Sequence, residues 1–193
     1  LSAMAAMGRD IKLAEARVEG YRNFGTKLWN AARFCEMNGC FEAVYFAPAK
    51  ASLPLTRWIV GEAVQAQNTV TEAIQAYRFN DAANGVYQFI WNNFCDWYVE
   101  LAKPLLKGDD AAAKAEVQAA TKWSLDHALR LLHPFMPFVT EELWAKTASR
   151  DGYLMLEHWP ILAEDLVDEG AMAEIGWLIG AISEIRSVRA EMK

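Results

Sequence analysis

The stretch from Gly20 to Phe34 reads GYRNFGTKLWNAARF, and its spacing of apolar and polar residues decides the fold. An α-helix turns by about 100° per residue, so residues three and four apart share a side. The small and apolar residues on one side of such a helix form the stripe predicted to be buried: Tyr21, Gly25, Leu28, Ala32 and Cys35. This period predicts a long amphipathic helix rather than a strand.

A second arc of the same helix is polar and cationic. The residues on and beside this arc are Arg22, Asn23, Thr26, Lys27, Asn30, Arg33 and Phe34. Arg22 and Arg33 lie about 16 Å apart along the helix axis. Cations, amides and an aromatic ring together suit an unstacked RNA base better than a small anionic metabolite. An ordinary solvated face is the alternative, since lysine and arginine are mostly exposed in proteins.

Composition places the chain among globular proteins with one sizeable core. It has 193 residues, of which 53% are hydrophobic, and its mean hydropathy is −0.01. The sequence has no run of about 18 apolar residues and no signal peptide, so we expect a cytoplasmic protein. Its three cysteines have neither zinc-knuckle spacing nor an even count, and we expect them to act as small apolar residues.

The charge of the chain is acidic overall but basic near its start. A net charge of −6 argues against a surface that grips phosphate backbones throughout, so DNA is not an expected partner. From Arg9 to Arg33, however, basic residues outnumber acidic ones, while the acidic residues gather late in the chain. If nucleic acid binds, we expect recognition of a few exposed bases near the first helix.

The remaining sequence also has the pattern of helices separated by turns. We expect helices over about residues 9–37, 54–79, 81–103, 110–133, 137–148 and 171–193, and an extended segment over 153–159. Ser52 is the candidate N-cap of the second helix and Pro54 lies in its first turn, while Pro104 and Pro134 are expected to end the third and fourth. Short connections between long helices predict an all-α antiparallel helix bundle.

Large aromatic side chains are dense along these helices. We expect most of the following to lie in the core: Trp58, Phe79, Tyr87, Phe89, Trp91, Phe94, Trp97, Tyr98, Trp123, Phe135, Phe138 and Trp144. Exposing them all would make the protein aggregate. A few rings emerging beside the first helix could stack on bases.

Three separated segments carry a resemblance to a known family. They are GYRNFGTKLWNAARF (20–34), WNNFCDWYVELAKP (91–104) and LRLLHPFMPFVTEELW (129–144). In this order and spacing they resemble the anticodon-binding helical bundle of the valyl-tRNA synthetase family, class I enzymes of the valine, isoleucine and leucine subgroup. RWI (57–59) and YRFNDAANGVYQFIWN (77–92) extend the likeness. The elements RNF, KLWNA and CDWY favour the valine enzyme within this subgroup.

The resemblance also implies how the chain is organised. Residues 1–160 would form the anticodon-binding bundle, and residues 161–193 a linker and the start of the C-terminal region. The chain lacks an initiator methionine and stops inside a helical pattern, so we expect a fragment of a longer protein.

The resemblance implies binding rather than catalysis. The full-length enzyme is a valine--tRNA ligase that uses ATP and Mg²⁺, but its catalytic and editing motifs have no counterpart here. No catalytic residue, metal site or cofactor is therefore expected in this fragment. The expected partners are the anticodon stem-loop of valine tRNA and the catalytic domain of the same polypeptide, with no membrane. Valine tRNAs share adenine and cytosine at the second and third anticodon positions, so the domain should read two bases and ignore the wobble base.

The candidate anticodon-binding residues combine cations, amides, a carboxylate and a ring. They are Arg22, Asn23, Lys27, Asn30, Arg33, Phe41, Glu100 and Lys103. Adenine and cytosine each expose an amino donor beside a ring-nitrogen acceptor, which a side-chain amide can match with both of its groups. The cations would hold phosphates or stack, and Phe41, in the loop after the first helix, is the candidate stacking platform.

Other functions remain open at this point. The anticodon-binding domain of a related isoleucyl or leucyl enzyme has a similar pattern. A non-catalytic helical protein-interaction module would also explain the acidic charge. An independent helical metalloenzyme would need Glu-x-x-His ligand pairs, which the helices lack. His133 is expected to meet the last carbonyls of its helix, and Glu141 and Glu142 to favour a helix N-terminus.

Overall fold

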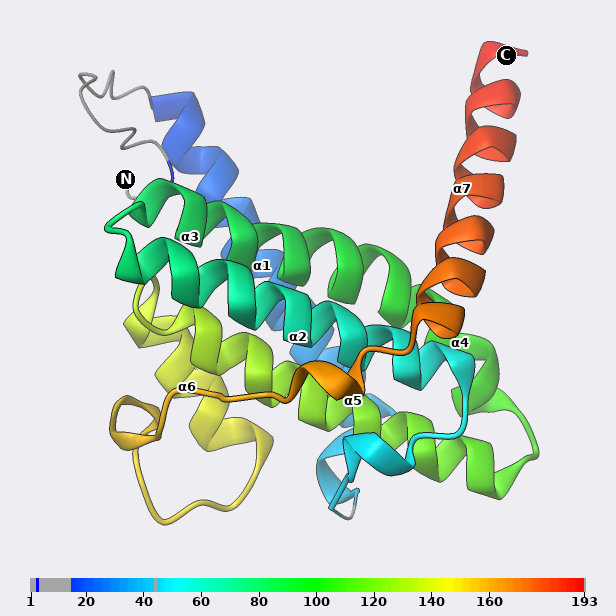
Figure 1. Cartoon of the computed structure of the whole chain (residues 1–193), viewed down its shortest axis with the longest axis horizontal. Coiled ribbons are helices and arrows are strands. Elements are labelled where there is room, and N and C mark those ends of the chain that lie inside the picture. The colour runs from blue at the N-terminus through cyan, green and yellow to red at the C-terminus, as the bar shows by residue number, and fades with distance from the viewer. Residues whose placement is uncertain (1–2, 4–14, 44, 193) are drawn as a thin grey trace.

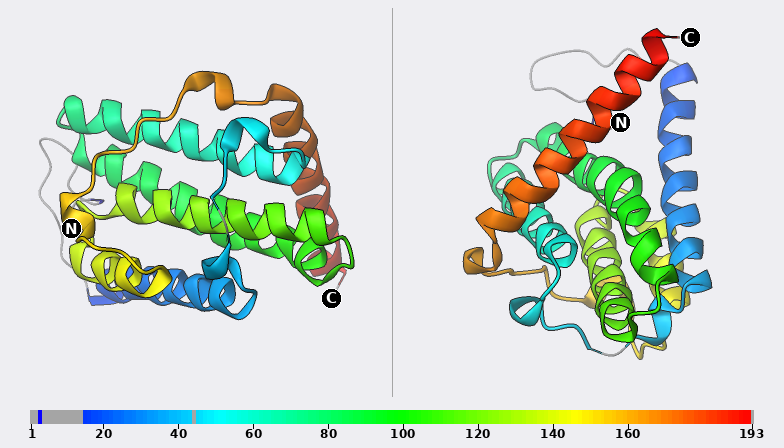
Figure 2. Two further views of the ribbon diagram at one scale, coloured as in Figure 1. Left: turned by 90° about the horizontal axis from the view of Figure 1, so that it is seen from below. Right: turned by 90° about the vertical axis from the view of Figure 1, so that its right-hand side faces the viewer.

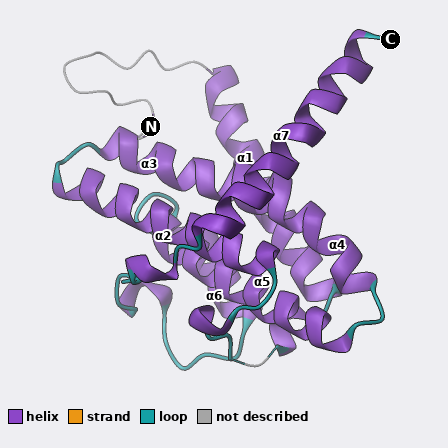
Figure 3. Cartoon of the chain, turned by 45° about the vertical axis from the view of Figure 1, so that its right-hand side comes forward, coloured by secondary structure: helices purple, strands orange, loops and turns teal. Residues whose placement is uncertain are grey.

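The computed structural model describes residues 3, 15–43 and 45–192. All regular elements in these residues are helical (Figure 3). The α-helices are α1 (Glu15–Met37), α2 (Pro54–Gln75), α3 (Phe79–Tyr87), α4 (Val99–Lys107), α5 (Ala111–Leu132), α6 (Pro137–Thr147) and α7 (Glu169–Glu191). A π-helical segment, η4 (Gln88–Tyr98), joins α3 to α4, and short 3₁₀ turns are η2 (Cys40–Glu42), η3 (Pro48–Lys50), η5 (Leu154–Leu156) and η6 (Glu164–Leu166).

The helices form the antiparallel bundle that the periodicity predicts. Helix α2 packs against α3 and α5, α4 packs against α5, and α1 lies against η4 and α6. Figures 1 and 2 show α5 running through the middle of the bundle, with α1 and α6 side by side along one edge. The part of the first predicted helix before Glu15 lies outside the described residues.

The buried side of α1 is shifted from the predicted stripe. Leu28, Ala32 and Cys35 are buried as expected, but Phe24 and Ala31 are also buried. Tyr21 is 37% exposed instead. The buried side of α1 is therefore rotated toward Phe24, because η4 covers the side of the helix that carries this residue.

Two helix ends depart from the sequence expectations. The third helix continues through Pro104 to Lys107, because the proline ring lies on the exposed side and removes only one backbone hydrogen bond. Ser52 does not cap α2. The carboxylate of Glu116 on α5 accepts the backbone N–H groups of Ser52 and Leu53 at 2.8 and 2.9 Å, and it also accepts the hydroxyls of Ser52 and Thr56.

His133 and Glu141 also have partners other than those expected. The Nδ1 atom of His133 lies 2.8 Å from the Thr140 hydroxyl, so His133 joins the end of α5 to α6. Glu141 accepts the backbone N–H groups of Leu154 and Met155. The 153–159 segment was expected to be extended, but it contains the turn η5. The two N–H groups bound by Glu141 belong to the first two residues of this turn.

Of the twelve aromatic residues expected mostly in the core, ten are buried or half-buried. The exceptions among these twelve are Phe79, which is 48% exposed, and Phe138, which is 91% exposed. Both lie in the first turn of their helices, where the side chain can point past the end of the bundle. Cys35, Cys40 and Cys95 are buried free thiols, in keeping with an apolar role.

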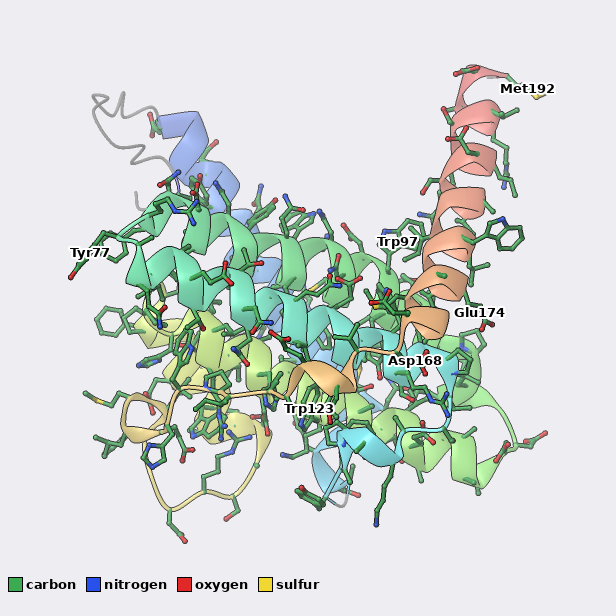
Figure 4. All side chains as sticks on the ribbon, in the orientation of Figure 1. Tyr77, Trp97, Trp123, Asp168, Glu174 and Met192 are labelled. Atoms are coloured by element: carbon green, nitrogen blue, oxygen red, sulfur yellow. The ribbon has the colours of Figure 1, made fainter. Side chains whose placement is uncertain are left out.

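Helix α7 packs most closely on the bundle through its beginning. Ala171 and Ile175 are buried, and the helix contacts α2. Asp168 caps its first turn by accepting the Ala171 N–H at 2.9 Å, and it pairs with Arg57 of α2 at 3.1 Å. Beyond these contacts α7 rises away from the bundle, as Figure 1 shows. The Arg186 guanidinium lies 5.1 Å from the ring centroid of Trp97, which Figure 4 labels beside this helix.

Candidate nucleic-acid interface

The outward side of α1 forms a polar ridge of exposed side chains. Its members are Arg22, Asn23, Thr26, Asn30 and Arg33. The Thr26 hydroxyl donates to the Arg22 carbonyl at 3.3 Å, so it stays on the helix surface. The arc predicted from helical spacing is therefore exposed, and its guanidinium and amide groups point to solvent.

On one flank of the ridge, Lys27 is held inside the fold. Its ammonium group pairs with the Asp96 carboxylate of η4 and lies 3.7 Å from the ring centroid of Trp91. The Lys27 side chain is only 24% exposed. This cation is thus committed to an ion pair and an aromatic face, and it contributes to the seam between α1 and η4 rather than to the free ridge.

Glu100 and Lys103 lie on the same flank and pair with each other. Their charged groups are 2.5 Å apart across one turn of α4. The Lys103 ammonium also lies 5.9 Å from the ring centroid of Phe34 on α1. The pair sits at the foot of the ridge, where its charges largely cancel.

Three stacked rings support this flank from below. The centroids of Phe24 and Tyr87 are 5.2 Å apart, and those of Tyr87 and Trp91 are 5.5 Å apart with an interplanar angle of 10°. Offset stacking of this kind adds to the burial of the rings. The stack fixes η4 against α1, and so fixes the position of Asp96 and Trp91, which bind Lys27.

On the other flank, a hollow brings Arg33 and Phe41 together. It encloses about 360 Å³ between α1, η2 and α6. Its lining residues are Trp29, Ala32, Arg33, Glu36, Phe41, Leu143, Lys146 and Thr147. The lining combines apolar side chains with charges of both signs, which suits a flat heterocycle with polar edges.

Two rim residues of this hollow were missed in the sequence. Glu36 lies three residues after Arg33, so helical spacing could have placed it on the same side. Lys146 comes from α6 and is brought to the rim only by the packing of α6 on α1. Its ammonium lies 3.2 Å from Glu142, and both side chains are 57% exposed, so the pairing is open to solvent.

The structure thus divides the eight predicted site residues into three groups. Arg22, Asn23 and Asn30 are on the ridge, and Arg33 and Phe41 meet at the hollow. Lys27, Glu100 and Lys103 form internal pairs on the opposite flank. Arg22, Asn23, Asn30 and Arg33 are exposed along α1, and the half-buried Phe41 adjoins them at the hollow, whereas the third group is separated from the hollow by the ridge.

Within residues 3, 15–43 and 45–192, no group of three or more His, Cys, Asp or Glu side chains could hold a metal ion. In the same part of the chain, no helix is long and apolar enough to span a membrane.

Comparison with known proteins gives consistent matches. Residues 56–193 match the family model described as the anticodon-binding domain of tRNA ligase. The chain is 55% identical to the valine--tRNA ligase of Caulobacter vibrioides, with 100% of this chain and 22% of that protein covered. It is 53% identical to that of Bradyrhizobium diazoefficiens (100% and 24% covered) and 56% identical to that of Brucella suis biovar 1 (100% and 21% covered).

A solved structure shares the fold at lower sequence identity. The agnB2 LeuRS of Agrobacterium radiobacter K84, in its ternary complex with tRNA and LeuAMS, is similar with a TM-score of 0.64. The likeness covers 86% of this chain and 20% of that one, at 21% sequence identity. The chain therefore spans less than a quarter of the length of each of these four proteins.

Proposed function

Because this chain belongs to the anticodon-binding domain family of tRNA ligases, we propose that it is the anticodon-binding part of a valine--tRNA ligase. In this role it holds the anticodon loop of valine tRNA in the cytoplasm. Its valine--tRNA ligase relatives are more than four times longer. Ligation of valine, with ATP and Mg²⁺, then belongs to the remainder of the polypeptide, whose catalytic domain is a second expected partner.

The observation that carries this proposal is the continuity of the ridge with the hollow. A row of exposed guanidinium and amide groups on α1 leads into a hollow of mixed apolar and charged lining, which includes Arg33 and the ring of Phe41. Single-stranded RNA is bound by this combination, since cations hold the backbone while rings stack on splayed bases. The acidic net charge of the whole chain does not oppose such local binding.

We assign separate roles to the two parts of this surface. Phe41 stacks on a base at the hollow, and Arg33 holds the adjacent phosphate or stacks on a second base. Asn23 and Asn30 offer paired donors and acceptors for the Watson–Crick edges of adenine or cytosine. Glu36 adds an acceptor that would suit the amino group of cytosine. Lys27, Glu100 and Lys103 support the ridge from the side.

A binding titration tests the proposal. The chain is titrated with valine tRNA, with the same tRNA changed at the middle anticodon base, and with isoleucine and leucine tRNAs. We expect the first to bind most tightly, because each wrong base leaves polar groups on the ridge unmatched. Equal binding of all four would reject base recognition. Tighter binding of the isoleucine or leucine tRNA would assign the chain to that related enzyme.

A further inference from the structure

The segment that connects α1 to α2 is wrapped around the first half of α5. This segment, residues 38–43 and 45–53, is called the strap below, and it carries Phe41. Along the strap, Cys40 is fully buried, and Phe46 packs edge-on to Trp123 of α5 with ring centroids 5.9 Å apart. The strap is thus fixed to α5 over its length, although it contains little regular structure.

The far end of the strap is held by Glu116. The carboxylate accepts two backbone N–H groups, those of Ser52 and Leu53, together with two side-chain hydroxyls. These bonds fix the point where the strap enters α2. Phe41 lies at the other end, more than ten residues away along the chain.

The near end of the strap is held by Gln118. Its side-chain Nε2 donates to the backbone carbonyl of Asn38 at 2.7 Å. This carbonyl belongs to the end of α1, where the last carbonyls have no partner within the helix. Gln118 therefore supplies a partner from α5 at the residue where the chain leaves α1.

The next residue, Gly39, makes the turn toward Phe41. Its φ is 70°, a left-handed conformation that favours glycine, and its N–H donates to the Glu36 carbonyl at 3.0 Å. A Cβ added to Gly39 would lie 3.1 Å from Nε2 of Gln118. The Gln118 amide thus lies directly over the turn and leaves it little room to change.

Gln118 and Glu116 bind the strap from nearly opposite sides of α5, because two successive residues turn a helix by about 200°. Gln118 acts three residues before Phe41, and Glu116 acts beyond the buried Phe46. Of these two contacts, the one made by Gln118 lies nearer to Phe41, at the turn from which the chain carries Phe41 to the hollow beside Arg33.

We propose that Gln118 is a positioning residue for anticodon recognition, which holds the Asn38–Gly39 turn so that the Phe41 ring stays at the hollow. This inference rests on the proposed function. Gln118 does not touch the RNA. It acts through the strap, and its effect on binding therefore depends on the presence of the Phe41 ring.

A double-mutant cycle measures that dependence. Gln118→Met keeps the length and apolar stem of the side chain and removes the donor. We expect it to weaken binding of valine tRNA about three- to tenfold, the factor of one neutral hydrogen bond. In a chain that already carries Phe41→Ala, the same change should weaken binding by less than about twofold. Gln118→Lys, which restores a donor on a long side chain, should recover part of the loss.

Glu116→Gln is the matched control at the far end of the strap. It should lower stability but show the same small effect on tRNA binding with or without Phe41. Equal losses from Gln118→Met in both backgrounds would overturn the proposal, because a merely structural residue acts independently of the ring. No loss in either background would also overturn it.

A measurement without RNA separates this inference from the proposed function. Amide hydrogen exchange of residues 40–43 should quicken in Gln118→Met but not in Glu116→Gln, if Gln118 fixes this end of the strap. Unchanged exchange would overturn the inference whatever the tRNA does. Failure of the unmodified chain to prefer valine tRNA would instead reject the proposed function, and the exchange result would still decide whether Gln118 positions Phe41.

Discussion

At the residue scale, the structure separates side chains that look alike in the sequence. Arg33 and Lys27 are cations on the same helix, yet Arg33 reaches the rim of the hollow while Lys27 is bound by Asp96 and Trp91. Helical spacing predicted the exposed arc, because that arc depends only on α1. It could not predict the pairing of Lys27, since Asp96 lies 69 residues away along the chain.

The two ridge arginines should affect binding without affecting folding. Arg22→Ala and Arg33→Ala each remove an exposed guanidinium, so the thermal unfolding midpoint should stay nearly unchanged while binding of valine tRNA weakens. The loss should be larger for Arg33, which also lines the hollow. Calorimetry and the tRNA titration check both effects.

Leu28→Ala is the control for these arginine variants. Leu28 is fully buried on the opposite side of α1, so its truncation should cost about 2–5 kcal/mol of stability. If the arginine variants lower the unfolding midpoint as much as Leu28→Ala does, the ridge is structural rather than functional.

Asn30 and Phe41 should differ in what they do to specificity. Asn30→Ala removes a base-edge partner, so it should narrow the affinity gap between valine tRNA and its middle-base variant. Phe41→Ala removes a stacking ring, and should weaken both RNAs by a similar amount, about 1–3 kcal/mol. Titration of each variant with both RNAs gives the comparison.

The result for Asn30 has a clear alternative. An equal loss for both RNAs would mean that Asn30 only supports the ridge, and base reading would then pass to Asn23, Glu36 or backbone groups. Phe41 is half-buried against the core. The thermal unfolding midpoint of the Phe41→Ala variant is therefore measured as well, to confirm that the variant is folded at the titration temperature.

At the scale of elements, the helices were predictable but some of the contacts at their ends were not. Apolar periodicity and the positions of Pro54, Gly108 and Pro137 predicted the helix limits that fall within the described residues to within a few residues, because these signals are local. The backbone N–H groups of Ser52 and Leu53, just before α2, are instead bound by Glu116, more than sixty residues away from Ser52. A carboxylate in the middle of an exposed helix face gives no local sign of such a role.

The hydrogen bonds accepted by Glu116 should make stability depend on pH. Burial opposes ionisation of this carboxyl, but hydrogen bonds from Leu53, Ser52 and Thr56 outweigh it and lower the pKa of Glu116. Because the pKa of Glu116 is lower in the folded chain, its ionised carboxylate stabilises the fold at pH values above the unfolded-state pKa of about 4.3. This stabilisation is lost as the pH falls through the lower folded-state value.

Glu116→Gln tests this linkage. At pH 7 the variant should be less stable by about 1 kcal/mol, the scale of a helix cap at a partly exposed site. The difference in unfolding free energy, measured in urea, should shrink as the pH is lowered from about 5 toward 3, because wild-type Glu116 becomes protonated. A difference that stays constant over this range would show that charge is not what Glu116 contributes.

At the scale of the whole molecule, sequence reasoning predicted the architecture and the exposed ridge of the candidate site. The all-α bundle followed from helix periods and short connections, and the ridge followed from α1 alone. The hollow did not follow, because it is formed where α6 and the strap meet α1. Surfaces built from several elements depend on packing angles that no local pattern encodes.

The charge distribution of the molecule sets the expected salt dependence of tRNA binding. The net charge is −6, and the described cations on the proposed surface are Arg22, Arg33 and Lys146. If about three phosphates are neutralised, the slope of log affinity against log salt concentration should be roughly −2 to −3, at about −0.7 per phosphate of single-stranded RNA.

Titrations of valine tRNA at about 50 to 300 mM salt measure this slope, and Lys146→Ala should make it shallower by about 0.7 if Lys146 meets one phosphate. Glu142→Ala is the matched control, because it frees the same lysine from its partner 3.2 Å away and should not make the slope shallower. A slope steeper than about −6 would require far more phosphate contacts than these three cations supply. Binding would then extend over a basic surface well beyond the ridge and the hollow, and the assignment of specificity to bases held at α1 would fail with it.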